Sequence, residues 1–364
     1  MNVTTKHSIT TLQFTLLIHG TQLGVGMLQI PRILAEQAGT DAWLSIIMNW
    51  IVSTAIGLLI IQIMKINPDR TMPDLFKHYF GKIFGALLTL VFIVFFTLTA
   101  VVEILRGMLF VKVWLLPETP DYIILITFVI PGYMIIRKGI QVLGRYAEMM
   151  FFCSLWIPIL YLLPLRDGSW LNLLPIPKDG FLPIIHAAIK NSYSFFGSEI
   201  AFLLYPMLIR KENASTAMIV GNSLTMLAYL LATLVCFIYF GPDAIMKYNE
   251  PSVSVLKTIE FRFIERLEIL LFTAYLFTVF KTWMSFIWAA SYSVGKVIGK
   301  AFMYRFLQIS LFFVVLYSVV YSHSFYENDL MQLWLGRASI FLSYAFPLFL
   351  YLYTRIIIRI RKYR

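Results

Sequence analysis

The sequence predicts an all-helical membrane protein with ten spanning segments, built as an inverted repeat of five segments plus five. Three observations lead to this fold class. Apolar residues make up 59% of the 364 residues and charged residues only 13%, far from the composition of soluble proteins. Ten stretches are long and apolar enough to cross a hydrocarbon core of about 30 Å, which takes roughly 20 residues. The first segment of each half is interrupted near its centre by polar residues and glycines.

The ten segments are joined mostly by short loops, so the chain is predicted to form one domain, 1–364, without a separate soluble module. A half with an odd number of segments ends on the opposite side of the membrane from where it began. The second half is therefore inverted relative to the first, and we place the halves at 9–164 and 183–358. The predicted segments are 9–35, 42–66, 83–115, 121–136, 141–164, 183–209, 215–240, 263–294, 303–321 and 335–358.

The net charge of +11 indicates membrane topology rather than nucleic-acid binding, because the basic residues gather at segment ends. With a cytoplasmic N-terminus, most Lys and Arg fall in inside loops and in the C-terminal tail. The positive-inside rule therefore places both termini in the cytoplasm. The first segment lacks an apolar region followed by small residues, so no cleavable signal peptide is expected. Acidic residues gather in the loop Asp243–Glu268, where Ser252–Arg262 is either an amphipathic interfacial helix or a plain solvated loop.

Segment one contains the stretch His19–Gly26, with three glycines and three polar residues where a simple span would carry Leu or Ile. Glycine lets the backbone leave helical geometry at low cost, and each break frees N–H and C=O groups. Such groups cannot be satisfied by hydrocarbon, so a break persists only where protein or a watery cavity surrounds it. The stretch therefore indicates a binding site at membrane depth; the alternative interpretation is a close helix crossing.

Segment six repeats this pattern. Apolar residues run from Leu182 to Ile189, polar residues and a glycine follow in Lys190–Glu199, and apolar residues resume from Ile200 to Ile209. Interrupted segments at corresponding positions of two halves are the best sequence indication of a transporter-type binding site. The repeat is inferred from this topology, because the two halves show no visible sequence similarity.

Three motifs resemble those of a known family. The stretch Leu23–Arg32, LGVGMLQIPR, is similar to the LGxGxLxxPR signature of spore germination B-subunit proteins. Phe196–Glu199, FGSE, is similar to their FLGxE stretch, and Glu265–Glu268, ERLE, resembles their ERxE motif at the start of segment eight. Chain length, ten segments and a basic C-terminal tail also match, so the resemblance covers essentially the whole chain.

The resemblance implies a fold, a role and partners. The family belongs to the amino acid–polyamine–organocation transporter superfamily, so the expected fold is the LeuT-like inverted repeat with broken helices 1 and 6. Its members are integral-membrane subunits of nutrient germinant receptors. We therefore expect an A subunit and a lipoprotein C subunit as partners in the spore inner membrane. Lys281 in segment eight departs from the family, whose members carry a neutral residue there.

The broken segments supply the candidate ligand contacts. Free N–H groups at the N-terminal end of a half-helix attract a carboxylate, and free C=O groups at the opposite end attract an ammonium. We expect the backbone at Gly24–Gly26 to hold the carboxylate of a free amino acid, and Ser194–Gly197 to meet its amino group or side chain. Pure packing is the alternative role. The predicted ligand-binding residues are Gly24, Val25, Gly26, Ser194, Phe195 and Gly197.

Ionisable residues inside the predicted spans are expensive to bury and need partners. Glu199 can pair with Lys281, and Glu103 can pair with Arg106 one helical turn away. In this fold a sodium ion often sits between segments one and eight, and the ammonium of Lys281 can take its place as a tethered charge. Structural pairing is the alternative. Lys190, closer to a segment end, can simply extend to the interface.

Other reactive residues are interpreted as structural. His19 and His186 lie in the broken segments, where a hydrogen-bonded role is favoured over proton sensing. Cys153 and Cys236 fall inside segments, which favours packing over a disulfide or a metal site. Tyr and Trp cluster near segment ends and are interpreted as interfacial belts. No metal-ligand cluster, phosphate-binding glycine loop or catalytic constellation is found, so neither an enzyme nor a cofactor is expected.

The leading hypothesis is a ligand-sensing membrane subunit that binds a small nutrient, with an amino acid as the first candidate. It would signal germination by shifting between conformations rather than by moving its ligand. A working secondary transporter for amino acids or ions is the rival, because both functions need the same broken helices. A structural anchor for partner subunits is the third interpretation.

Overall fold

The computed structural model describes residues 8–174, 180–259 and 267–362, which are helical almost throughout. Short 3-10 turns join several helices, and one π-helical stretch, Ile340–Ala345, lies in the last segment. The α-helices are α1 (Thr11–Gln22), α2 (Ile30–Ala38), α3 (Trp43–Ile66), α4 (Met72–Trp114), α5 (Asp121–Ile136), α6 (Ile140–Ser154), α7 (Trp156–Tyr161), α8 (Phe181–Lys190), α9 (Ala201–Leu204), α10 (Ala214–Ile245), α11 (Pro251–Ser254), α12 (Leu267–Val297), α13 (Lys300–Val320), α14 (Phe325–Ser339) and α15 (Phe346–Lys362).

These helices form the ten predicted segments, which confirms the fold class. Segment one is α1 with α2, segment five is α6 with α7, segment six runs from α8 to α9, and segment ten is α14 with α15. The other six are the single helices α3, α4, α5, α10, α12 and α13. In the described part of the chain, seven helical stretches are long and apolar enough to cross a membrane, and α5 and α8 are shorter apolar helices. Neither segment one nor segment six contains a single helix of that length, because a break divides each of them.

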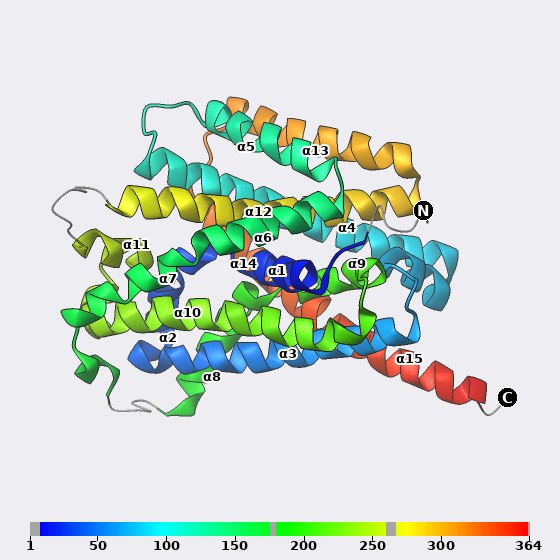
Figure 1. Ribbon diagram of the computed structural model, residues 1–364, viewed down its shortest axis with the longest axis horizontal. Coiled ribbons are helices and arrows are strands. Elements are labelled where there is room, and N and C mark those ends of the chain that lie inside the picture. The colour runs from blue at the N-terminus through cyan, green and yellow to red at the C-terminus, as the bar shows by residue number, and fades with distance from the viewer. Residues whose placement is uncertain (1–7, 175–179, 260–266, 363–364) are drawn as a thin grey trace.

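Segment one occupies the middle of the bundle, where α1 packs against α6, α10 and α12 (Figure 1). Every residue from Gln13 to Gln22 is buried. By contrast, the outer helix α13 exposes Phe312, Phe313 and Val320 by 63%, 59% and 80%. A large apolar surface of this kind is unfavourable in water and favourable in lipid, so the outer surface fits a bilayer.

The ends of the two broken segments lie side by side. The N–H of Ile9 donates to the carbonyl of Met207 at 2.8 Å, and the N–H of Ile209 donates to the carbonyl of Ile9 at 3.1 Å. The residue just ahead of α1 therefore lies beside the residues that end segment six. Segment one begins where segment six ends, as an inverted repeat requires. The division of the chain at 9–164 and 183–358 stays a prediction.

Segment three begins where the hydropathy pattern predicts, and segment ten begins earlier. Within α4 the backbone is not helical at Gly81, where φ is +80°, so a short helix from Met72 precedes a kink and the spanning helix follows it, close to the predicted residue 83. Segment ten starts at Phe325 rather than at residue 335, behind a capping box formed by Ser324 and Glu327. This extension carries charged and polar side chains. These lower the mean hydropathy of the first turns without preventing a helix, because side chains at a segment end can reach water.

The stretch Ser252–Arg262, expected to be either an interfacial helix or a solvated loop, is helical up to Thr258, but it packs on the bundle. Helix α11 and the 3-10 turn Val255–Thr258 follow each other, and Ser252 is fully buried. Its Oγ donates to the carbonyl of Met27 in segment one at 3.3 Å. This part of the loop therefore packs on the bundle rather than at a lipid surface. The rest of the predicted helix, and the ERxE residues Glu265 and Arg266, lie outside the described residues.

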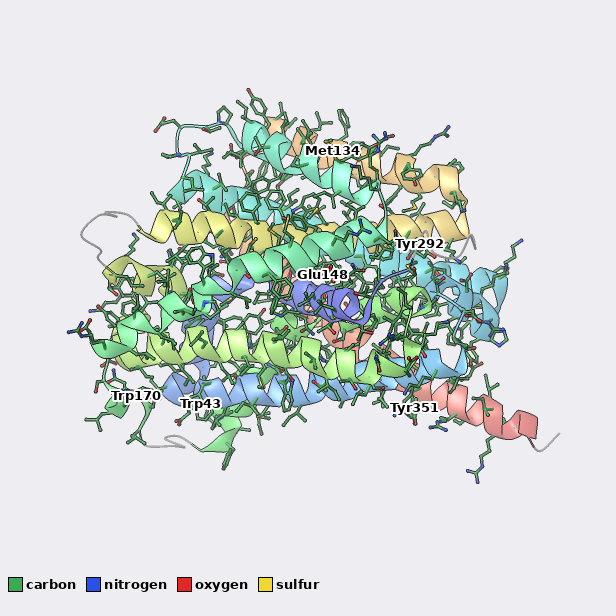
Figure 2. All side chains as sticks on the ribbon, viewed as in Figure 1. Trp43, Met134, Glu148, Trp170, Tyr292 and Tyr351 are labelled. Atoms are coloured by element: carbon green, nitrogen blue, oxygen red, sulfur yellow. The ribbon has the colours of Figure 1, made fainter. Side chains whose placement is uncertain are left out.

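Aromatic side chains mark the two ends of the bundle. In Figure 2, Trp43 and Trp170 lie toward one end, and Tyr292 and Tyr351 lie toward the other. Trp and Tyr favour the boundary between lipid and water, because the ring meets hydrocarbon while the polar atom meets water. The two groups are separated along the direction of the helix axes, as expected for a protein that spans a membrane.

Candidate ligand-binding site at the two broken segments

The break in segment one begins where α1 ends at Gln22. Gly24 is extended, with φ −90° and ψ −172°, and the 3-10 turn Val25–Leu28 follows before α2 starts at Ile30. Pro31 stands in the first turn of α2, where the missing N–H costs little because helix starts leave that group without a partner. Glycine thus opens the break, and proline begins the second half-helix.

Segment six breaks after α8 ends at Lys190. The 3-10 turns Ser192–Phe195 and Ser198–Ile200 flank Gly197, whose φ is +119°. Residues other than glycine adopt that conformation only with strain. A Cβ at Gly197 would also lie 2.7 Å from Oγ1 of Thr21. Backbone geometry and packing therefore both require glycine at this position.

Gln22 joins the two breaks in a buried polar cluster. Its Nε2 donates to the carbonyl of Phe195 at 3.1 Å and to Oδ1 of Asn222 at 2.6 Å. The same nitrogen lies 3.2 Å from Oγ of Ser198, and Oγ of Ser53 donates to the carbonyl of Phe195 at 2.9 Å. The two breaks predicted from sequence, more than 170 residues apart, therefore meet at one place in the core.

Two tyrosines from other segments satisfy carbonyls at the breaks. Tyr229 on α10 donates to the carbonyl of Gln22 at 2.5 Å and lies 3.2 Å from the carbonyl of Ser194. Tyr275 on α12 donates to the carbonyl of Gly24 at 2.5 Å. A buried carbonyl without a donor costs free energy, so these hydroxyls stabilise the unwound backbone.

Lys281 lies between segments one and eight. A Cβ on Gly20 would come 2.8 Å from its Cδ, and the residue is only 1% exposed. The neighbouring Thr282 donates its hydroxyl to the carbonyl of Gly20 at 2.7 Å and lies 3.2 Å from the carbonyl of Leu23. The side chain of Lys281 therefore lies against segment one. The function of its charge stays a prediction.

Glu103 on α4 lies directly against the break in segment one. A Cβ on Gly24 would come 2.6 Å from its Oε2 and 3.1 Å from its Oε1. The hydroxyl of Tyr193, from the break in segment six, donates to Oε1 at 3.2 Å. A Cβ on Gly26, in contrast, would meet nothing within 4 Å. The site thus contains a buried carboxylate at Gly24 and open space at Gly26.

Arg106 was predicted to pair with Glu103, but its ion pair is with a different residue, Asp329. Nη1 of Arg106 lies 2.7 Å from Oδ1 of Asp329 on α14. The guanidinium also stacks over the rings of Phe325 and Phe110, at 4.7 and 5.3 Å. One helical turn separates the two residues on α4, and each contacts a different neighbour: Glu103 segment one, Arg106 segment ten.

Glu199 turns back onto its own segment rather than toward Lys281. Its Oε2 accepts a hydrogen bond from the N–H of Gly197 at 2.8 Å. Beside it, Tyr344 in the π-helical stretch donates to the carbonyl of Ser192 at 3.0 Å. No ion pair within the described ranges joins Glu199 to Lys281, because Lys281 packs on α1 and Glu199 lies toward segment ten.

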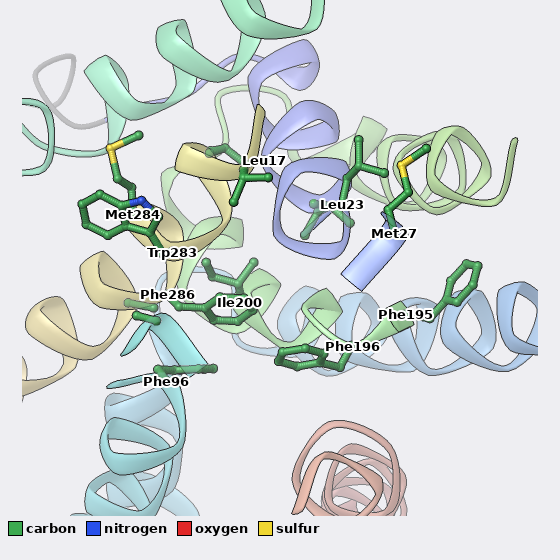
Figure 3. Packing of buried hydrophobic residues seen from close by; sticks show 14 of the residues in the cluster. Leu17, Leu23, Met27, Phe96, Phe195, Phe196, Ile200, Trp283, Met284 and Phe286 are labelled. Atoms are coloured by element: carbon green, nitrogen blue, oxygen red, sulfur yellow. The ribbon is translucent and has the colours of Figure 1, made fainter. Parts of the chain in front are cut away.

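The aromatic residues of segment six point in opposite directions (Figure 3). The ring of Phe195 packs against Tyr229, with centroids 5.4 Å apart. The ring of Phe196 packs against Tyr193 at 4.6 Å and against Phe286 at 5.2 Å. Phe195, a predicted ligand contact, is thus fully enclosed by protein, whereas Phe196 lies beside the tyrosine that contacts Glu103.

The remaining predicted contacts, Ser194 and Val25, are local to the breaks. Oγ of Ser194 donates to Oδ1 of Asn191 at 2.7 Å, and Val25 begins the 3-10 turn after Gly24. The sequence did not identify the side chains that reach the breaks from other parts of the chain. In the sequence, each of these side chains is a polar residue within an apolar segment. Such a residue indicates a buried polar group but does not identify its hydrogen-bond partner. The missed residues are Gln22, Tyr193, Asn222, Tyr229, Tyr275 and Thr282.

The histidines differ in their surroundings. Nδ1 of His19 lies 3.0 Å from Oγ1 of Thr225, and its ring meets the ring of Phe151 edge-on at 5.8 Å. These contacts fit a structural role. His186 on α8 is exposed. In the part of the chain that the structure describes, no three His, Cys, Asp or Glu residues gather where they could hold a metal ion.

A family model described as spore germination protein matches residues 8–330. The chain belongs to the spore germination protein family. This confirms the resemblance drawn from Leu23–Arg32 and Phe196–Glu199. The chain is therefore a germination-related membrane protein.

Curated relatives are spore germination proteins of bacilli. YndE of Bacillus subtilis strain 168 is 27% identical over 296 residues, which is 80% of this chain and 82% of the relative. GerQB of Bacillus cereus is 25% identical over 351 residues, 95% of each chain. For GerQB the similarity thus extends over nearly the full length of both chains.

Two solved transporters share the fold of this germination protein. MhsT in complex with L-phenylalanine gives a TM-score of 0.63 at 12% identity, covering 86% of this chain and 80% of its own. A substrate-bound, outward-open Na⁺-coupled sialic acid symporter gives 0.64 at 12% identity, covering 89% and 76%. At such low identity these likenesses show the LeuT-like fold alone.

Proposed function

We propose that this chain is the integral-membrane subunit of a nutrient germinant receptor. It binds a small nutrient, an amino acid in the first instance, between the broken segments one and six. Binding shifts the protein between conformations, and that shift signals germination. A ligand moves such an equilibrium only as far as its affinities for the two states differ, so the contacts at the breaks must change with the state.

One observation carries this proposal: both breaks converge on the polar cluster around Gln22. Its single amide nitrogen contacts the carbonyl of Phe195 and the side chains of Ser198 and Asn222. A ligand that displaces or tightens any of these bonds acts on segments one and six at once. Such coupling is what a sensor needs, because a small molecule then changes the relative position of two helices.

The secondary transporter is the alternative, favoured by the fold shared with two solved transporters. Against sodium coupling, several carbonyls at the break in segment one already accept hydrogen bonds from protein hydroxyls. Thr282 donates to Gly20, and Tyr275 donates to Gly24. A cation at these oxygens would have to compete with those donors. A structural anchor for partner subunits is the third function to be tested.

The proposed partners are the A subunit and the lipoprotein C subunit of the receptor, in the spore inner membrane. Both termini are proposed to face the cytoplasm. The basic C-terminal residues support this orientation, because Lys and Arg gather on the cytoplasmic side of membrane proteins.

Paired binding and uptake in proteoliposomes tests the proposal. The purified chain is reconstituted, and labelled amino acids and sugars are assayed for saturable binding and for accumulation. Saturable binding without accumulation is the expected result for a sensor. Accumulation against a gradient would instead show a transporter, and the absence of both would leave the anchor. Empty liposomes and the Gly197→Ala variant, which distorts the break in segment six, serve as controls.

A further inference from the structure

The direction in which a ligand would bind follows from two buried charged residues one helical turn apart on α4. Glu103 is 2% exposed and Arg106 is 1% exposed. Three residues advance about 4.5 Å along an α-helix, so the two charged groups leave α4 at neighbouring levels. The separation suits a molecule that carries a positive and a negative group on one carbon atom.

The carboxylate of Glu103 occupies the place at which the sequence analysis expected the carboxylate of a ligand. Its Oε2 lies 2.6 Å from where a Cβ of Gly24 would stand, so residue 24 must be glycine for the carboxylate to lie there. A second carboxylate beside it would meet like charge in a poorly solvated place, which is strongly unfavourable. An ammonium there would meet opposite charge. The unwound segment one therefore selects the amino end of a ligand.

The hydroxyls around Glu103 present acceptors to a ligand. Tyr193 donates its proton to Glu103, and Tyr229 and Tyr275 donate theirs to carbonyls of segment one. Tyr275 donates to Gly24, the residue against which the carboxylate of Glu103 lies. Each phenol has a single proton, but its oxygen keeps lone pairs. An ammonium offers three donors and no acceptor, so it complements this surface, whereas a carboxylate does not.

Arg106 supplies the matching donor. Its Nη1 pairs with Asp329, while its Nη2 is buried and has no hydrogen-bond partner among the described residues. A guanidinium presents its N–H groups as a planar fork that fits carboxylate oxygens. A buried N–H without a partner is unfavourable, and a ligand oxygen would supply that partner. This unused donor is an independent indication of a ligand group.

We propose that the ligand is an α-amino acid whose ammonium binds Glu103 and whose carboxylate binds Nη2 of Arg106, the reverse of the orientation expected from the sequence. This inference rests on the proposed ligand-binding function and specifies its chemistry. The side chain of the ligand then lies toward Gly26, where a Cβ meets nothing within 4 Å. Asp329, with a side chain 51% exposed, holds the other arm of Arg106 and positions it.

A ligand series on the reconstituted full chain tests this orientation. The probes are the common L-amino acids, each with its amide, which lacks the carboxylate, and its deamino acid, which lacks the amine. The tightest ligand should be a free amino acid, with its amide and its deamino acid weaker by about tenfold or more. An amide as tight as its parent would remove Arg106 from the site, and an equally tight deamino acid would remove Glu103. Absence of saturable binding by any probe would refute the proposed function and this inference together.

Variants distinguish this orientation from the reverse one. Arg106→Gln should weaken the amino acid but not its amide, so that the two bind within about twofold of each other. Glu103→Gln should equalise the amino acid and its deamino acid in the same way. Selectivity against the amide that survives in Arg106→Gln would overturn the assignment.

Conservative and control variants guard against misfolding. Arg106→Lys and Glu103→Asp keep each charge and should restore part of the lost selectivity if the full truncations fail to fold. Glu148→Gln is the matched control, because this carboxylate on α6 accepts a hydrogen bond from Gln13, near the start of α1, whereas the break begins at the other end of α1, after Gln22. Its selectivity should equal that of the natural chain. Loss of selectivity in the control as well as in the truncations would show a global effect and sink the assignment.

Discussion

The breaks in segments one and six look alike in sequence but are built differently. The break in segment one is bounded by charge, with Glu103 against Gly24 and Lys281 against Gly20. The break in segment six is held by its own neighbours: Glu199 accepts from the N–H of Gly197, two residues earlier. The first break is therefore lined by charged side chains, whereas the second is held in its shape by its own residues.

The two breaks also differ in the free space around their glycines. Gly26 in segment one has room for a side chain, whereas Gly197 in segment six lies against Thr21. Segment six also contacts the π-helical stretch of segment ten through Tyr344. π-helical turns are frequent at functional sites, because they locally change how a helix packs. Under the proposed function, recognition therefore belongs to segment one, and segment six, which contacts segment ten, is the proposed route of transmission.

The largest expected effect is at Gly197. Gly197→Ala places a Cβ at φ +119° and 2.7 Å from Oγ1 of Thr21, so the break must distort. Backbone strain alone costs about 1–3 kcal/mol, and the contact with Thr21 adds to it. The thermal unfolding temperature of the detergent-purified protein should fall clearly. Gly336→Ala is the control, since its Cβ would make an ordinary 3.5 Å contact with Tyr193. Equal stability of both variants would contradict a shape-fixing role for segment six.

A smaller effect is expected at the glycines of segment one. Gly24→Ala pushes a methyl group into the carboxylate of Glu103, so ligand affinity should fall about tenfold. Gly26→Ala enters open space and should leave affinity within about twofold. Equilibrium binding to proteoliposomes measures both. A larger loss at Gly26 than at Gly24 would move the recognition site away from Glu103.

The fold was predictable because hydropathy and glycine placement are local signals. Segment lengths follow from apolar runs, and His19–Gly26 and Lys190–Glu199 indicate the breaks by polarity alone. The boundary that failed, at Phe325, is a polar helix start, where local hydropathy falls although the helix continues. Local signals therefore predicted the number of segments better than their ends.

The partners of the buried groups were not predictable, because they depend on which helix face meets which neighbour. Glu103 and Arg106 have the spacing of a pair, yet α4 lies between segments one and ten and offers each residue a different partner. Tyr229 and Tyr275 belonged to a class of residue interpreted as interfacial belts. They are instead buried donors to the unwound backbone. Only packing distinguishes these two uses of tyrosine.

A double-mutant cycle tests whether the two breaks are separate electrostatic units. Since no ion pair in the described structure joins Lys281 to Glu199, the effects of Lys281→Met and Glu199→Gln should add within about 0.5 kcal/mol. Ligand affinity and thermal stability supply the two readouts. A coupling of about 1 kcal/mol or more would reinstate the pair predicted from sequence.

If the charge of Lys281 stands in for a cation, exchanging sodium for potassium should not change ligand binding to the natural chain, and Lys281→Met should weaken that binding.

The smallest expected effect is a pH dependence at Glu250, just ahead of α11, which packs on segment one through Ser252. Burial raises the pKa of the Glu250 carboxyl above its ordinary value, although Arg106 and other nearby cations oppose the shift. A raised pKa means that the folded protein holds the proton more tightly than the unfolded chain does. The resulting stabilisation is fully present below the ordinary pKa of glutamate and is lost as pH rises through the raised value.

Thermal unfolding of the natural chain and of Glu250→Gln, compared between about pH 4 and pH 7, measures this contribution. The unfolding temperature of the natural chain should fall more steeply with rising pH than that of the variant, because the amide introduced by the substitution cannot ionise. Glu212→Gln provides the control, since this residue lies at the far end of α10 from Glu250. Parallel slopes for Glu250→Gln and the natural chain would show that the charged surroundings of segment one do not extend to α11. The contrast between a charged first break and a self-contained sixth break would then be confined to Glu103, Arg106 and Lys281.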